Sequence, residues 1–192
     1  MENKKTFVRK NGQLFEKMDI LKYFFEDSEK EFHLRELARI SRLAPSTVST
    51  YINGLVKSEV IITRKSRGFR LFKSNTESAI YKDAKLFYNI FLIRNSGLID
   101  YLIREFNHPK CIILFGSFRK SENTPKSDID IFIETPAKKT PELSKFEKKL
   151  GHNIQLFQFS SKNIEDMKNN GKELINGIVN GIVLEGFFEA FK

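Results

Sequence analysis

A chain of 192 residues with 40% hydrophobic residues and 19 Phe can bury one large or two small cores, which excludes a disordered protein. It has no apolar run of membrane-spanning length and no signal-peptide core behind its charged start, so we expect a cytoplasmic protein with no membrane partner. The net charge of +9 is uneven, because residues 1–75 hold 16 Lys and Arg against 9 Asp and Glu, whereas residues 76–192 hold 17 against 15. This imbalance predicts that the first part binds a polyanion.

The first third of the chain predicts three helices and a hairpin. Residues 17–28, 32–40 and 46–58 carry apolar side chains at helical spacing, and Pro45 stands at a favoured position for a helix start. Ala44 precedes it and offers no capping side chain, which costs the third helix about 1 kcal/mol. Residues 61–73 are rich in β-forming residues around Gly68 and predict a small basic hairpin.

This order of elements is that of a winged helix-turn-helix, and the stretch from Leu34 to Ile52 resembles prokaryotic winged-helix regulators. The resemblance implies that residues 1–75 bind double-stranded DNA. Small polar residues of the third helix lie away from its apolar stripe and would enter the major groove: Ser46, Thr47, Ser49, Thr50 and Asn53. Cations of the hairpin would hold phosphates: Arg64, Lys65, Arg67 and Arg70. A solvated helix face or a protein-binding module is the alternative.

Residues 76–106 predict a helical connector between two domains. Gly97 interrupts the helical pattern, so we expect two helices, over 76–95 and 96–106. The apolar stripe of the first helix leaves two alternatives open, packing in a core or pairing with a second copy in a homodimer.

The most informative motif of the chain is a pair of carboxylates on an apolar strand. Residues 111–115 predict a strand, Gly116 and Ser117 a small turn, and residues 128–134 a second strand that carries both aspartates. The side-chain period of two places Asp128 and Asp130 on one face of that second strand. Two adjacent carboxylates are suitable ligands for a Mg²⁺ ion that bridges protein and nucleotide phosphates.

The Gly-Ser pair, a spacer of ten residues and Asp128-Ile129-Asp130 resemble the signature of polymerase-β-like nucleotidyltransferases. The chain as a whole resembles small prokaryotic, largely archaeal proteins in which a winged helix precedes such a domain. The resemblance implies that Asp128 and Asp130 are catalytic and hold Mg²⁺ or Mn²⁺. It also implies nucleotide-binding roles for four residues, which would seat the phosphates of an NTP or offset the charge of the leaving pyrophosphate: Gly116, Ser117, Lys120 and Lys126.

The rest of the chain completes an α+β fold, with residues 107–192 as a nucleotidyltransferase-like domain on a short mixed sheet. Further elements are expected as helices over 141–150, 163–170 and 173–180 and strands over 153–159 and 182–184, with Gly151 ending the first of these helices. Cys111 is the single cysteine and is interpreted as a buried apolar residue in a reducing compartment, not as a nucleophile.

Gln155 stands where such enzymes carry a third carboxylate on the neighbouring strand. A carboxamide has no negative charge and cannot act as a general base. Glu134 shares the parity of the aspartates but lies about 13 Å beyond Asp130, so it is not expected to replace the missing ligand. Two hypotheses therefore remain: a DNA-binding enzyme that transfers NMP to a hydroxyl acceptor, and a transcriptional regulator whose degenerate domain only binds nucleotide.

Overall fold

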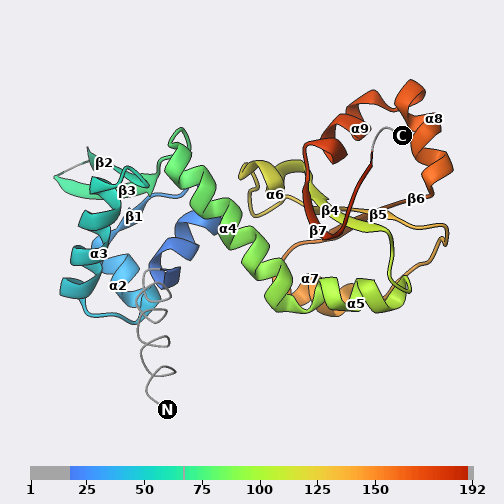
Figure 1. The fold of residues 1–192 in the computed structure, drawn as a ribbon. Helices are drawn as coiled ribbons and strands as arrows, with labels where there is room; N and C mark the ends of the chain where they lie inside the picture. The colour runs from blue at the N-terminus through green and yellow to red at the C-terminus, as the bar shows by residue number, and fades with distance from the viewer. Residues whose placement is uncertain (1–17, 67, 190–192) are drawn as a thin grey trace, which may run out of the picture. The chain divides into compact units, whose positions relative to one another are not determined.

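The computed structural model describes residues 18–66 and 68–189 and has a mixed α+β architecture with two small sheets. The chain forms two compact units, which divide between Lys85 and Leu86 inside helix α4 (Ala79–Ser96) (Figure 1). Within the described part of the chain, no helix combines the length and apolar character needed to cross a membrane.

The first unit joins helices to a three-stranded antiparallel sheet of order β1-β3-β2. A helix covers residues 18–26. The elements that follow it are β1 (Phe32–His33), α2 (Leu34–Ser41), α3 (Pro45–Lys57), β2 (Ile61–Ser66) and β3 (Phe69–Ser74). The predicted hairpin is confirmed in β2 and β3, and Ala44 precedes α3 without a side-chain cap, as expected.

The helix predicted over residues 32–40 was wrong at its first two residues. Residues 32 and 33 were expected to be helical, yet they form β1, and the helix begins at Leu34. The cause is a long-range contact, because Phe32 lies opposite Phe72 in the sheet and is buried with its ring 4.9 Å from that of Phe24.

The second unit is built on a mixed sheet of order β6-β5-β4-β7, in which only β5 and β6 run parallel. Its elements after α4 are α5 (Leu98–Glu105), β4 (Cys111–Phe115), α6 (Gly116–Lys120), β5 (Ile129–Glu134), α7 (Ser144–Leu150), β6 (Ile154–Phe159), α8 (Ser161–Asn170), α9 (Lys172–Val179) and β7 (Ile182–Gly186). The small mixed sheet expected from the sequence is confirmed.

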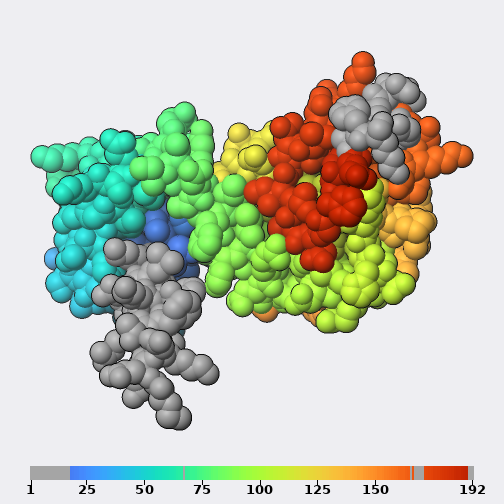
Figure 2. Space-filling view, viewed as in Figure 1, coloured from blue at the N-terminus to red at the C-terminus, as the bar shows by residue number. Residues whose placement is uncertain are grey.

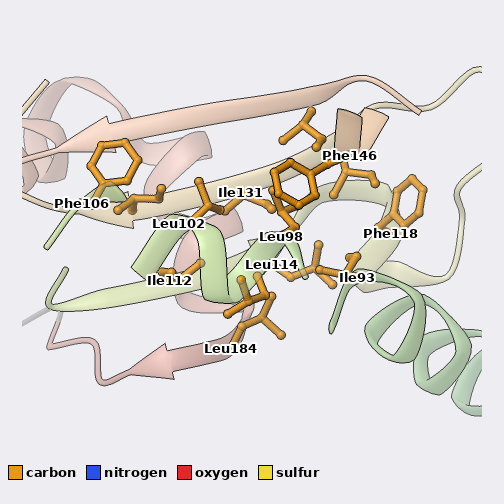
Figure 3. Close-up of a cluster of buried hydrophobic side chains, with 14 residues drawn as sticks. Ile93, Leu98, Leu102, Phe106, Ile112, Leu114, Phe118, Ile131, Phe146 and Leu184 are labelled. Carbon is orange, nitrogen blue, oxygen red and sulfur yellow. The ribbon is translucent and has the colours of Figure 1, made fainter. Parts of the chain in front are cut away.

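Helices cover both faces of this sheet (Figure 1). On one face, side chains of α4, α5, α6 and α7 pack with those of β4, β5 and β7, and Figure 3 labels ten residues of this core. On the other face, Ile164 of α8 and Ile175 and Ile178 of α9 pack on Cys111, Ile113, Phe115 and Phe132. Strand β5 therefore supplies apolar residues to both cores, with Ile131 and Phe132 fully buried on opposite faces.

Two local expectations for this unit need correction. Gly116 to Lys120 form a single helical turn, α6, where a turn and a polar loop were expected. Helix α7 begins at Ser144 and not at Pro141, and the Glu142 amide before it donates to the Tyr101 hydroxyl at 3.1 Å. The two glycine signals are confirmed, since Gly97 and Gly151 both adopt left-handed backbone at the predicted helix boundaries.

We predict that Leu102→Ala lowers the free energy of unfolding of the second unit by about 2–5 kcal/mol, because it leaves a cavity in this core. Cys111 can report it: the thiol is fully buried, and burial together with the charge of Glu134 raises its pKa to about 12. It should therefore react with a thiol reagent only when the unit opens, and the denaturant dependence of labelling gives the free energy.

The matched control is Val179→Ala in α9, a helix at the surface of this unit (Figure 2) whose Val179 side chain is 49% exposed. Its unfolding free energy should change by no more than about 0.5 kcal/mol. Rapid labelling of Cys111 in the native wild-type protein would contradict the assigned burial.

Candidate active site

The candidate site forms where β4 ends and β5 begins. In the antiparallel pairing of these strands, Phe115 lies opposite Asp130, so the carboxylate of Asp130 meets the next residue, Gly116. A Cβ at Gly116 would lie 2.0 Å from Oδ2 of Asp130, and Gly116 has φ +67°, which L side chains rarely adopt. Only glycine fits this position, for a reason beyond the phosphate approach that the sequence suggested.

Asp128 and Asp130 place two negative charges close together at the start of β5. Burial and, to a smaller extent, the charge of Asp128 raise the pKa of Asp130 above its ordinary value. Among residues 18–66 and 68–189, no cation forms an ion pair with either carboxylate. One detail of the prediction is corrected: Asp128 lies immediately before β5 and is not part of the strand.

The neighbouring strand β6 contributes two carboxamides. Asp130 lies in parallel register with Gln155, as the predicted parity required. Asn153, just before β6, donates from Nδ2 to Oδ1 of Asp128 at 3.1 Å. The site thus presents two carboxylates beside two neutral amides, and Asn153 fixes one oxygen of Asp128.

The turn before β6 holds the start of β5 in place, which the sequence analysis did not recognise. Nδ1 of His152 lies 2.7 Å from the carbonyl oxygen of Ser127, and the His152 ring meets that of Phe118 edge-on at 4.9 Å. The carbonyl of Asn153 accepts from the Ile129 amide at 2.8 Å. The available signal was the pair of polar residues between Gly151 and an apolar strand.

A buried side-chain amide on α4, that of Asn89, holds helix α6 in place. Nδ2 of Asn89 donates to the carbonyl of Phe118 at 2.8 Å and to Oδ1 of Asn123 at 2.9 Å. Asn89 is 2% exposed, so both bonds lie away from solvent and are costly to lose. They tie α6 and the loop after it to one helix.

The predicted nucleotide-binding residues lie near the place where β4 ends and β5 begins, but they do not all line one hollow. Ser117 follows Gly116 in the first turn of α6. Lys126 lines a hollow of about 390 Å³ together with Asp128, His152 and Asn153. Lys120 is exposed at the end of α6 and does not line that hollow.

Beside Lys120, Arg119 donates from Nε to the carbonyl of Asn180 at 2.7 Å.

A divalent cation would have to rely on more than protein carboxylates. In the described part of the chain, no three His, Cys, Asp or Glu side chains are grouped to hold a metal ion. Glu134 does not join the pair, since it is 3% exposed and bound by Lys110 at 3.3 Å and Ser161 at 2.7 Å. The two unneutralised carboxylates still fit a cation whose remaining ligands come from phosphate oxygens.

The residues predicted to contact DNA lie on the first unit. Ser46, Thr50 and Asn53 are exposed on α3, while Thr47 and Ser49 are half-buried. The hairpin cations differ in their partners. Arg64 donates two hydrogen bonds to Glu31, at 2.5 and 2.7 Å, and Arg70 donates one to Asn53 at 3.3 Å. Lys65 is exposed. Arg67 lies outside the described residues.

Residues 96–173 match a family model described as a nucleotidyltransferase domain. The matched segment runs from the end of α4 into α9 and contains both carboxylates, Gly116 and Gln155. It therefore supports nucleotidyl transfer as the general activity of this part of the chain. No curated protein and no solved structure matched the chain.

We predict that Gly116→Ala destabilises the second unit more than Gly97→Ala. Both glycines have positive φ, so both variants carry the backbone strain of about 1–2 kcal/mol, but a Cβ at Gly97 meets nothing within 4 Å. Only Gly116→Ala drives a methyl group into the Asp130 carboxylate. The thiol-labelling measurement at Cys111 gives both free energies.

The clash is tested by removing its partner. In an Asp130→Ala background, Gly116→Ala should cost no more than Gly97→Ala does. An undiminished cost in that background would show that the Asp130 carboxylate is not what excludes the methyl group.

Proposed function

We propose that the second unit binds an NTP with Mg²⁺ or Mn²⁺ and transfers its NMP to a hydroxyl acceptor. The observation that carries the proposal is the carboxylate pair Asp128 and Asp130, which has no cation partner in the described structure and lies within the nucleotidyltransferase match. A divalent ion bound there would neutralise the pair and orient the phosphates for displacement of pyrophosphate.

The other residues have roles that follow from their positions. Gly116 lets the Asp130 carboxylate lie against the backbone at the start of α6. The amide and hydroxyl of Ser117 are donors for phosphate oxygens. Lys126, which lines the hollow beside Asp128, offsets negative charge on the pyrophosphate, and Lys120 is the second candidate for that role.

The alternative is a regulator whose second unit binds nucleotide without chemistry. Gln155 favours it, because this neutral side chain stands in register with Asp130 where a third carboxylate would activate the acceptor. Asn153 is also an amide, so β6 supplies no general base beside the pair. The two hypotheses share the nucleotide site and differ only in turnover.

We propose further that residues 1–75 form a winged helix-turn-helix that binds double-stranded DNA, with 76–106 as connector and 107–192 as the catalytic domain. Support comes from the order helix, short strand, helix, helix, hairpin and from the exposed polar face of α3. Exposed Ile80 and Phe87 on α4 support the homodimer expected from its apolar stripe.

We predict that calorimetry detects Mg²⁺-dependent binding of at least one NTP to the wild type and none to the Asp128→Asn/Asp130→Asn variant. The physical reason is that the amides remove the negative charge that holds the cation. Asp100→Asn, an exposed aspartate on α5, is the control and should bind as the wild type does. Equal binding by the double variant would exclude this site.

Turnover then separates the enzyme from the regulator. Pyrophosphate release that is abolished by Asp128→Asn with unchanged DNA affinity identifies the enzyme. Nucleotide binding without release, which alters DNA affinity, identifies the regulator.

We predict that the logarithm of DNA affinity falls linearly with the logarithm of salt concentration, because bound cations release counterions from the phosphates. Lys65→Ala should reduce the magnitude of that slope by about 1, the value for one phosphate contact. Lys138→Ala, an exposed lysine of the second unit, should leave the slope unchanged. An affinity independent of salt would contradict DNA binding by the first unit.

A further inference from the structure

A groove of about 800 Å³ on the first unit lies between α2, α3 and β3, and its lining is cationic and aromatic. Three arginines line it: Arg35, Arg39 and Arg70. In the described part of the chain no carboxylate pairs with Arg35 or Arg39, and the one acid of the lining, Glu36, pairs instead with Lys30 at 3.2 Å. The groove therefore has a net positive charge.

Two cations of the hairpin, one on each strand, are already paired with carboxylates. Arg64 is held by both carboxylate oxygens of Glu31, and Lys73 lies 2.7 Å from a carboxylate oxygen of Glu29. A polyanion that docks on this unit meets unpaired arginines in the groove and neutralised cations beside it.

Phe69 gives the groove a flat apolar surface. It is 63% exposed, and the edge-on contact with the exposed His33 ring, at 5.6 Å and 87°, orients it. In the same lining, Arg70 donates to Asn53 at 3.3 Å and lies over the buried ring of Phe72 at 5.1 Å. An exposed aromatic ring beside unpaired arginines has the chemistry of a site for a nucleobase with its phosphates.

We infer that this groove takes an unpaired base of a nucleic acid strand, with the base stacked on Phe69 and the adjoining phosphates bound by Arg35 and Arg39. Ser49 and Asn53 line the same groove and provide polar groups for the base edge. A base inside a duplex has both faces covered by its neighbours, so only an unpaired base can stack on the ring. The inference rests on the proposed nucleic acid binding by the first unit and adds to duplex binding a site for an unpaired base.

The chain contains no tryptophan, so Phe69→Trp introduces a single indole reporter into the full-length protein. A mixed-sequence single-stranded oligonucleotide should quench its fluorescence as the base stacks, whereas the fully paired duplex of the same sequence should not. The control is Ile62→Trp on β2, a residue that is 48% exposed and outside the groove, whose fluorescence should not respond.

Affinity measured by anisotropy gives the second readout. Phe69→Ala should weaken single-strand binding about 5- to 100-fold, the range expected for one stacked base, and leave duplex binding unchanged. Phe69→Trp should restore single-strand affinity. Arg35→Ala/Arg39→Ala should weaken binding and reduce its salt dependence.

The outcomes separate this inference from the proposed function. Equal binding of single strand and duplex, with no quenching of the indole in Phe69→Trp and no loss in Phe69→Ala, would overturn the stacked base and leave DNA binding intact. Absence of binding to every oligonucleotide in the wild type would overturn both. Quenching by the single strand alone, together with loss of affinity in Phe69→Ala, supports the inference.

Discussion

The contact between the Asp130 carboxylate and Gly116 is the constraint on which the second unit's site depends. It follows from the register of β4 and β5, which sets Phe115 opposite Asp130 and so brings the residue after β4 under the carboxylate. A slip of one residue would turn Asp130 into the larger core and turn Ile129, Ile131 and Ile133 out of it. The apolar residues on both faces of β5 forbid that slip, so the cores of the unit fix the position of a charged group.

Two carboxylates on the same face of β5 show how differently a fold can treat buried charge. Glu134, at the end of the strand, is neutralised by Lys110 and bound by Ser161. Asp130, near its start, has burial and the charge of Asp128 against it, both of which raise its pKa. A carboxylate that the described protein stabilises has a structural role, whereas one left without compensation takes up a proton or binds a cation from outside. This difference, more than the Asp-x-Asp pattern, distinguishes a binding site from a strand end.

Much of this site could be predicted because its determinants are local in the sequence. The alternation of Ile129, Ile131 and Ile133 with the aspartates gives the strand and its faces, and the parity of β6 gives Gln155 its place beside Asp130. Contacts between distant segments could not be predicted in this way. The pairing of Phe32 with Phe72 replaced the start of a helix by a strand.

The polar supports of the site were missed for the same reason. Asn89 and Asn123 are 34 residues apart in the chain. Neither residue belongs to a periodic pattern, and their partnership arises only when α4 packs beside α6. Asn153 and His152 lie close in sequence to β6, but their partners are on the far side of α7, before β5.

The first unit shows why a charge total does not identify a binding face. The excess of cations in residues 1–75 predicted a polyanion partner, and the basic hairpin was its expected site. Pairing of β1 with β3 brings the acidic segment before β1 to the hairpin, where Glu31 binds Arg64 and Glu29 binds Lys73. Those carboxylates neutralise Arg64 and Lys73, whereas Lys65 stays exposed on the hairpin. Arg35 and Arg39 of α2, which form no ion pair within the described residues, lie beside an exposed aromatic ring, so α2 as well as the hairpin presents accessible positive charge.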